Sequence, residues 1–211
     1  MADKNSPVQS APEGKESTRQ RILDGATDVF SEKGYHGAAV DDIVRASQTS
    51  KGSFYFHFPS KQDIFFSLVD RFIVSLAQSA EKAIAQERGA LAKVSAALDT
   101  VFTTFSRHRS LAKILLVGGV GLGKAFDERL LAIHARFAFM IEEHLEEAVV
   151  EGSIPPLNTE ITAYAWLGAV NEVVVRWLYT GQPDPLEETL DTLRELLLRS
   201  ICAETERQAI P

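Results

Sequence analysis

The chain has 211 residues, 45% of them hydrophobic, which is enough for one large domain or for a small domain followed by a medium one. The net charge of -7 excludes a protein that coats nucleic acid through general basicity. The charge is also uneven, because residues 1–61 hold eight Lys and Arg against eight Asp and Glu, whereas residues 62–211 hold 14 against 21. A neutral front part before an acidic body suits contact with phosphate through one small surface.

The first residues, 1–16, lack the apolar segment of a secretory signal and are expected to form a flexible tail. No apolar run approaches the length of a membrane span, so no membrane association is expected. The single cysteine, Cys202, excludes an internal disulfide and suits a reducing compartment. We therefore expect a cytoplasmic protein.

Nearly every later segment has a helical period, and none alternates like a strand, so we predict an all-α fold of nine helices. Gly34 is expected to end the first helix, and the fourth helix carries an apolar stripe over several turns. The expected helices cover residues 17–33, 40–46, 50–57, 60–87, 91–107, 110 to the glycines that begin at 118, 127–151, 159–179 and 185–204.

The second and third helices are short, and a turn of three residues, 47–49, separates them, which predicts a helix-turn-helix. The start of the third helix would then lie nearest the DNA bases. Lys51 can reach a guanine edge or a phosphate there, and Gly52, a poor helix former, suggests close approach of the helix to the duplex. The residues expected at the DNA are Thr18, Thr49, Ser50, Lys51, Gly52, Ser53, Phe54, Tyr55, His57 and Lys61.

Several of these residues have a second interpretation. Thr49 and Ser50 can contact phosphate or cap the third helix. Tyr55 and His57 can donate hydrogen bonds to phosphates, although His57 can equally be a packing residue. Lys61, at the start of the fourth helix, can complete a second phosphate clamp.

Two aromatic residues of this segment, Phe54 and Phe58, lie four apart and fit the core of the small domain. For Phe54, packing in the core is thus the alternative to a place at the DNA.

The segment from Thr18 to Leu68 resembles the DNA-binding domain of the tetracycline-repressor (TetR) family. Two departures concern Ala38–Ala39, where the family usually has a threonine or serine, and Gln48–Thr49, where its turn usually has Gly-Val. The residues that carry the resemblance are Ile22, Leu23, Ala26, Phe30, Gly34, Tyr35, Val40, Ile43, Ser50, Gly52, Tyr55, His57, Phe58, Lys61 and Ile64.

The resemblance implies a homodimeric, ligand-responsive transcriptional regulator, usually a repressor, that binds a palindromic operator in double-stranded DNA and is released by a small-molecule effector. Residues 17–62 would be the DNA-binding domain. Residues 63–211 would form the helical ligand-binding and dimerisation domain, with the last two helices at the dimer interface.

The last two helices carry more apolar surface than one packed face needs, which favours a partner helix, although the eighth helix can also be the centre of the bundle. The predicted dimer interface is Trp166, Val170, Val174, Trp177, Leu186, Leu190, Leu193 and Leu197.

A hydrophobic effector would bind among aromatic and polar groups of the fifth to eighth helices, although Phe and Met at helical spacing usually belong to a core. The candidate ligand residues are Phe102, Phe105, His108, Phe126, His134, Phe137, Met140, Trp166, Asn171 and Arg176.

The segment from Gly118 to Lys124 nearly fits a phosphate-binding loop and is the basis of an alternative, nucleotide-binding interpretation. We reject it because Ala125 lacks the hydroxyl that holds magnesium and no parallel sheet is expected. The histidines and the cysteine have no metal-ligand spacing. No enzyme activity, metal or cofactor is therefore predicted. A plain interaction module would not explain Lys51, Gly52 and Lys61 in that order.

Overall fold

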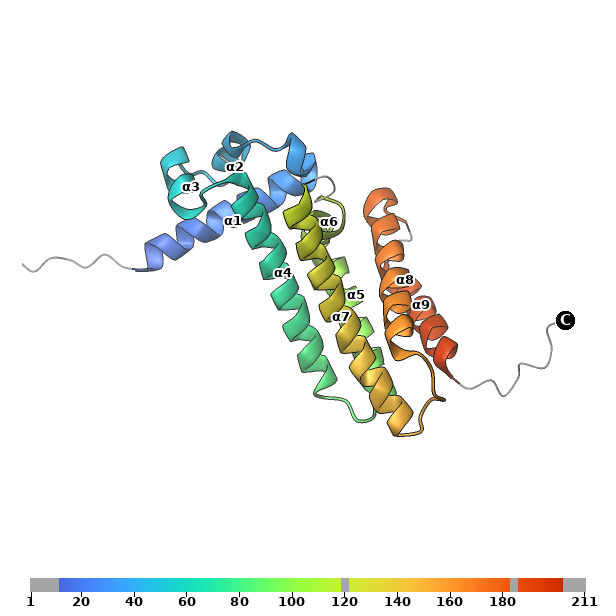
Figure 1. Cartoon of the computed structure of the whole chain (residues 1–211). Helices are drawn as coiled ribbons and strands as arrows, with labels where there is room; N and C mark the ends of the chain where they lie inside the picture. The colour runs from blue at the N-terminus through green and yellow to red at the C-terminus, as the bar shows by residue number, and fades with distance from the viewer. Residues whose placement is uncertain (1–11, 119–121, 183–185, 203–211) are drawn as a thin grey trace, which may run out of the picture. The chain divides into compact units, whose positions relative to one another are not determined.

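The computed structural model describes residues 12–118, 122–182 and 186–202, with the side chains of 12–16 and 186–188 left aside. All its regular elements are helices, and the all-α prediction is confirmed (Figure 1). The chain divides into two compact units, residues 1–69 and 70–211. The helices are α1 Pro12–Gly37, α2 Val40–Ala46, α3 Lys51–His57, α4 Lys61–Ile84, α5 Ala90–Arg107, α6 Arg109–Leu116, α7 Lys124–Val150, α8 Thr159–Thr180 and α9 Leu186–Ile201.

The first unit contains α1, α2, α3 and the beginning of α4 around one small apolar core. Phe30 of α1 meets Phe65 of α4 edge to face, with ring centroids 5.3 Å apart. Ile43 of α2 and Phe54 of α3 are fully buried in the same unit. Each helix therefore contributes large apolar side chains to the core.

Helix α1 begins before the predicted start at Ser17, since the backbone is helical from Pro12. Its regular part ends at Gly34, whose φ of 69° and ψ of 174° are not helical. A positive φ is readily adopted by glycine and costs other residues strain, so this residue ends the regular helix as predicted.

The turn between α2 and α3 is built without glycine. Gln48 takes the left-handed conformation itself, with a φ of 52°. Ser50 then caps α3, because its hydroxyl accepts a hydrogen bond from the Ser53 amide at 3.1 Å. At the start of α2, Ala39 has no capping side chain, and the carboxylate of Asp42 accepts the Ala39 amide instead, at 3.2 Å.

The turn lies very close to α1. A Cβ added to Gly25 would come within 2.7 Å of the Ser47 backbone nitrogen. Ser47 is itself buried, and its hydroxyl lies 2.8 Å from the Thr49 hydroxyl. The absence of a side chain at Gly25 thus lets the α2–α3 turn pack directly on α1.

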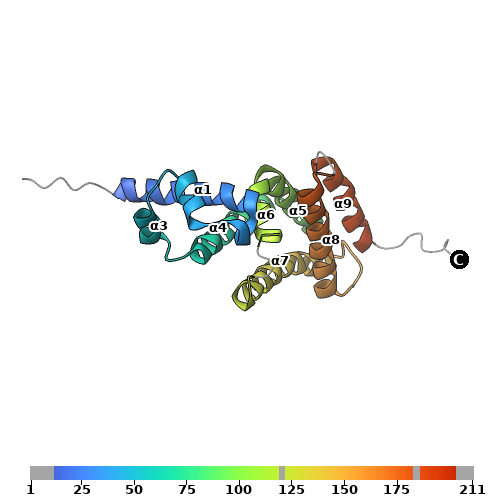
Figure 2. The same ribbon diagram turned by 90° about the horizontal axis from the view of Figure 1, so that it is seen from above.

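The second unit, from Asp70 onward, is a helical bundle. Helix α7 packs on α5 and α8, and α5 packs on α9. The α8 and α9 helices lie side by side in both views (Figures 1 and 2). Asn158 caps α8, since its side-chain oxygen accepts a hydrogen bond from the Ile161 amide at 2.9 Å. None of the helices that the structure describes is long and apolar enough to cross a membrane.

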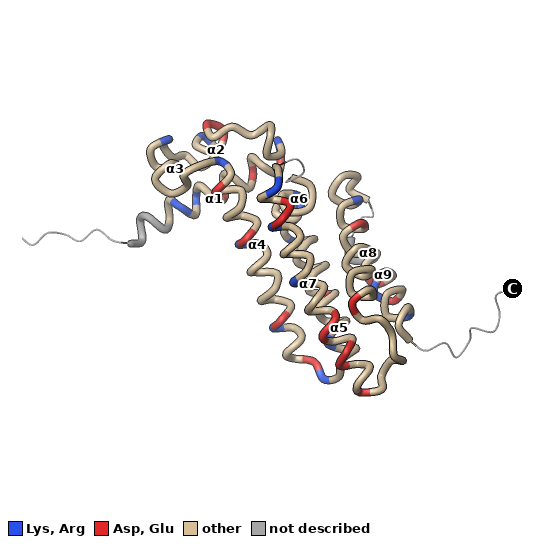
Figure 3. Tube along the Cα trace, viewed as in Figure 1, with Lys and Arg blue, Asp and Glu red and all other residues tan. Residues whose placement is uncertain are grey.

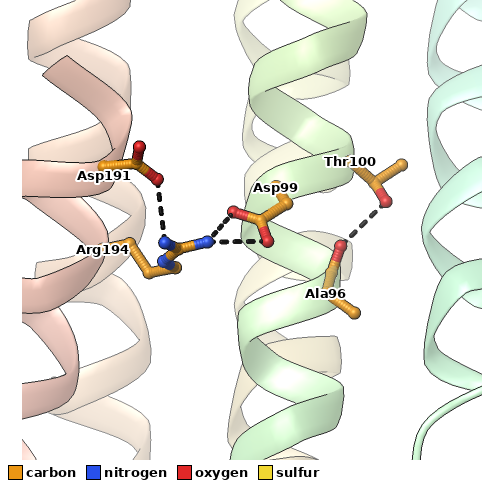
Figure 4. Close-up of polar contacts among 5 residues, drawn as sticks. All are labelled: Ala96, Asp99, Thr100, Asp191 and Arg194. Carbon is orange, nitrogen blue, oxygen red and sulfur yellow. Dashed lines mark hydrogen bonds and ion pairs between the residues drawn. The ribbon is translucent and has the colours of Figure 1, made fainter. Parts of the chain in front are cut away.

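A charge pair fastens α9 to α5. The guanidinium Nη1 of Arg194 lies 2.7 and 2.9 Å from the two carboxylate oxygens of Asp99 (Figure 4). Its second nitrogen donates to Asp191 on α9 itself, at 2.8 Å. A planar guanidinium shared between two carboxylates fixes orientation better than a single contact, so Arg194 helps to orient α9 on α5.

We expect Gly25→Ala to lower the free energy of unfolding of the first unit by about 1–3 kcal/mol, because the new methyl group meets backbone rather than a flexible side chain. Gly37→Ala is the matched control, since a Cβ there meets only the Lys33 Cβ at 3.6 Å. Chemical denaturation of both variants measures the difference. Equal stability of the two would contradict the close approach of the turn to α1.

Candidate nucleic-acid interface and ligand cavity

The start of α3 is exposed, whereas its middle is anchored. Lys51 and Gly52 are exposed, and the Lys51 side chain is 62% accessible. Tyr55 is 52% exposed, so the side of α3 that bears these residues is open to a partner. Thr18, Thr49, Ser53 and His57 are half-buried at its margins.

Phe54 departs from its predicted place at the DNA. Its side chain is fully buried and its ring packs on Phe58, with centroids 6.1 Å apart. A buried ring cannot reach a base edge from this conformation, so the core interpretation holds for Phe54 and the place at the DNA is corrected. The exposed aromatic neighbour is Phe56, at 68%. Its position halfway along a short aromatic helix gave no sequence signal for exposure.

Lys61 is also engaged inside the first unit. Its ammonium donates to the carbonyls of Tyr35 and Ala38, at 2.7 and 2.8 Å, and lies 4.3 Å from the centre of the Tyr35 ring. Burial lowers the pKa of Lys61. These contacts fasten the start of α4 to the segment after Gly34, and the phosphate contact of Lys61 stays a prediction.

Gly52 has no internal reason to be glycine. A Cβ built there meets only the Ser50 hydroxyl, at the ordinary distance of 3.8 Å. A glycine within a helix costs about 1 kcal/mol relative to alanine. Since the chain itself leaves room for a side chain, the small residue favours close approach by something outside the chain.

The second unit encloses a cavity between α4, α5, α6, α7 and α8, with an empty volume of about 870 Å³ that includes its open side. Seventeen of its twenty lining residues are apolar, and the three others are His134, His144 and Asn171. Burial lowers the pKa of His134, which favours its neutral form. Such a lining suits an apolar molecule with few polar groups.

Five of the ten predicted ligand residues line this cavity: Phe105, His134, Phe137, Met140 and Asn171.

The other five predicted ligand residues lie elsewhere. Phe102 and Phe126 are buried in the core, Arg176 is exposed, and His108 precedes α6 at its exposed N-cap. The indole N–H of Trp166 donates to Ser200 of α9 at 3.2 Å.

The aliphatic part of the lining was not predicted. It includes Ile73, Leu76 and Ala80 of α4, whose regular apolar stripe indicated a packed core. Ala97 and the leucines of α6 carried no signal either. The only indication in the sequence that α4 also lines a cavity was the length of its apolar stripe, which continues past the small first unit.

The carboxylate of Glu147 on α7 contacts His144 of the cavity wall. His144 Nδ1 lies 3.1 Å from Glu147, and the same carboxylate pairs with Lys93 of α5 at 2.5 Å. Hydrogen bonds from Lys93 and then from His144 lower the pKa of Glu147. The hydrogen bond to Glu147 therefore holds the His144 ring in one orientation at the cavity wall.

Of the predicted dimer residues, those that the structure describes are buried within the single chain, so their apolar surface is covered without a partner helix. The side chain of Leu186 lies outside the described residues. The others are between 0 and 9% exposed, since α8 packs on α6 and α7 and α9 packs on α5 and α8: Trp166, Val170, Val174, Trp177, Leu190, Leu193 and Leu197.

A different face of α8 is open. Ile161, Tyr164 and Tyr179 are 63%, 47% and 69% exposed, and Ala165 and Gly168 lie between them at helical spacing. Nothing lies within 4 Å of a Cβ built on Gly168. This open face, Ile161 to Tyr179, carries these apolar side chains together with the exposed charges of Glu172 and Arg176.

The segment that resembles a phosphate-binding loop is described only in part, since residues 119–121 lie outside the described residues. Lys124 opens α7 and pairs with Glu128 one turn on, at 3.4 Å, with both side chains exposed. No group of three or more His, Cys, Asp or Glu that could hold a metal occurs among the described residues.

The helix-turn-helix segment coincides with a match to a known family. The family model for bacterial regulatory proteins of the tetR family matches residues 22–68. This range contains α2, the turn, α3 and the tie at Lys61. Residues 22–68 thus resemble the DNA-binding segment of tetR-family proteins.

Known HTH-type transcriptional proteins are similar over most of the chain. The HTH-type transcriptional regulator SrpR of Pseudomonas putida is 29% identical over 166 residues, which are 79% of this chain and 76% of SrpR. The HTH-type transcriptional repressor DhaR of Mycobacterium sp. is 28% identical over 194 residues, 86% of this chain and 93% of DhaR. Both relatives are HTH-type transcriptional proteins, and the similarity to them extends well beyond the helix-turn-helix segment.

A solved structure shares the fold. The transcriptional regulator FadR from Bacillus subtilis, solved in complex with stearoyl-CoA, has a TM-score of 0.75 and 22% identity, and covers 86% of this chain and 98% of its own. The likeness thus extends through both units.

We expect Gly52→Ala to have opposite effects on folding and on DNA. The free energy of unfolding should rise by up to about 1 kcal/mol, because alanine is the better helix former and has room. Affinity for DNA should fall by at least about tenfold, because a methyl group would hold α3 away from the duplex. Thermal denaturation and a gel shift measure the two effects. Undiminished DNA affinity would show that Gly52 does not face the duplex.

Proposed function

We propose that the protein is a homodimeric repressor that binds a palindromic operator through α3 of each subunit and leaves it when an elongated apolar effector fills the cavity of the second unit. The observation that carries the proposal is the presence, in one chain, of an exposed Lys51–Gly52 helix start and a cavity walled almost wholly by apolar side chains. Repression agrees with the name of the relative DhaR.

Helix α4 gives a physical route from effector to DNA. Its first residue, Lys61, is fastened to Tyr35 and Ala38 in the first unit, whereas Ile73, Leu76 and Ala80 on the same helix line the cavity. A helix is stiff along its axis, so a ligand that displaces the cavity segment of α4 also acts on the residues near its start. Occupancy of the cavity thereby changes how α3 is presented to the operator.

Ion pairs hold α4 to α7 at the cavity. Asp70 of α4 makes a two-point contact with Arg129 of α7, with the Nε donor at 2.8 Å from Oδ1. Glu81 and Arg136 form a looser pair along the same two helices, at 3.6 Å. These exposed pairs contribute little to stability. They can therefore yield when a ligand separates α4 from α7.

The effector class that fits best is a long-chain acyl thioester. The cavity offers an apolar path with only His134, His144 and Asn171 as polar groups, which suits a hydrocarbon chain ending in a polar function. The related FadR structure contains stearoyl-CoA. Under this proposal the hydrocarbon chain of the effector lies against α4 and α7, and its polar part remains toward the open side of the cavity.

We expect stearoyl-CoA to raise the melting temperature of the protein and to dissociate it from DNA upstream of its own gene, whereas free coenzyme A does neither. At a hundredfold excess over Kd the stabilisation is about 2.7 kcal/mol. Ala97→Phe should abolish both effects, because its ring would occupy the cavity, and Ser79→Phe on the exposed side of α4 should retain them. Stabilisation by polar compounds alone would contradict the apolar effector.

The homodimer is expected to form through the open face of α8. A glycine within this face, Gly168, allows a partner helix to come close, as small residues do at helix contacts. Tyr164 and Tyr179 supply large apolar area on the same side.

We expect Gly168→Arg to convert the dimer to a monomer and to weaken operator binding, because the new side chain has room in the single chain but blocks a second α8. Gln78→Arg adds the same charge on the exposed side of α4 and should remain dimeric. Sedimentation velocity separates the two states. A dimeric Gly168→Arg variant would place the interface elsewhere.

A further inference from the structure

The start of α3 is paired with an acidic residue of α2. The Lys51 ammonium lies 2.7 Å from Oδ1 of Asp41, and the two side chains are 62% and 58% exposed. The pKa of Lys51 is raised, first by this hydrogen bond and then by the charge of Asp41. The cation best placed on α3 to meet DNA therefore already has a carboxylate partner.

The neighbouring acid, Asp42, pairs with other groups than Lys51. Its carboxylate accepts the Ala39 amide and pairs with Lys33 at 3.0 Å, so it closes the start of α2 and ties it to α1. The charge of Asp41 also favours the start of α2. Asp41 nevertheless differs from Asp42 in reaching from α2 to α3.

An exposed ion pair of this kind contributes little to stability, so its larger consequence concerns binding. A lysine that neutralises a phosphate releases a counterion and gains affinity for any sequence. Lys51 gains nothing of this kind while Asp41 neutralises it. If Lys51 leaves Asp41 to pair with a phosphate, the free carboxylate of Asp41 also remains close to the negative DNA backbone.

We propose that Asp41 is a specificity-determining residue that withholds Lys51 from the phosphates of non-cognate DNA and gives it up only where the sequence offers a guanine edge. The inference rests on the proposed DNA-binding role of α3. A guanine presents two acceptors, O6 and N7, in the major groove, which can replace the carboxylate. Asp41 thus lowers the affinity for non-cognate DNA rather than raising the affinity for the operator.

The test compares Asp41→Asn with the native protein on two duplexes, one of random sequence and one selected by the native protein from a randomised pool. Asparagine keeps the shape and frees Lys51. Affinity for the random duplex should rise about three- to tenfold, the scale of one unit charge at contact distance in water. The slope of log affinity against log salt should steepen by about one. Affinity for the selected duplex should rise less, so the ratio between them falls.

Three variants isolate the charge pair. Asp41→Glu keeps the charge and should retain the native ratio. Asp28→Asn removes an exposed acid from α1 and should leave the random-duplex affinity unchanged. With Lys51→Ala already present, Asp41→Asn should no longer steepen the salt dependence, because no lysine remains to be freed.

Random-duplex affinity and salt slope that equal the native values in Asp41→Asn would overturn the inference, and so would an equal rise on both duplexes. Asp41→Ser provides the same comparison if the asparagine variant does not fold, which a thermal melt shows. A native protein that binds no duplex at all would instead overturn the DNA-binding role of α3, and the inference with it.

Discussion

The burial of Phe54 is the constraint on which the DNA-binding unit depends. Helix α3 has seven residues, and a helix this short is not stable by itself in water. Full burial of one phenylalanine side chain contributes about 1.5–3 kcal/mol, and Phe54 supplies it against the packed helices of the first unit. With that side turned inward, Lys51, Gly52 and Tyr55 are left on the open side. The anchor and the recognition surface are thus two sides of the same short helix.

The second unit uses apolar residues in two ways that look alike in sequence. Phe102 and Leu145 fill the core, whereas Phe137 and Leu76 stand at a space that the chain leaves empty. Filling that space would add packing contacts. A regulator whose effector occupies it gains the same contacts only when the effector is present. The cavity thus makes the packing of α4 depend on a small molecule.

The glycines in helices differ in whether the chain itself requires the absence of a side chain. Gly25 is required by the chain itself, because the Ser47 backbone occupies the place of a side chain. Gly52 and Gly168 have room around them, yet both lie in helices, where glycine is unfavourable. The internal glycine shapes the fold that presents α3. The two open glycines lie where the proposals place the duplex and the second subunit.

The sequence by itself determined the helices, the turn at Gln48 and the tetR-family resemblance, because capping, helical period and the length of α3 are local properties. Only the tertiary structure decided what each apolar residue faces. It decided for the core as the place of Phe54, buried Leu190, Leu193 and Leu197 within the chain, and brought Ile73, Ala97 and Phe137 to one cavity. The physical reason is that a helix can bury several faces against different neighbours. A cavity, moreover, is a place where five helices fail to meet, which no single segment encodes.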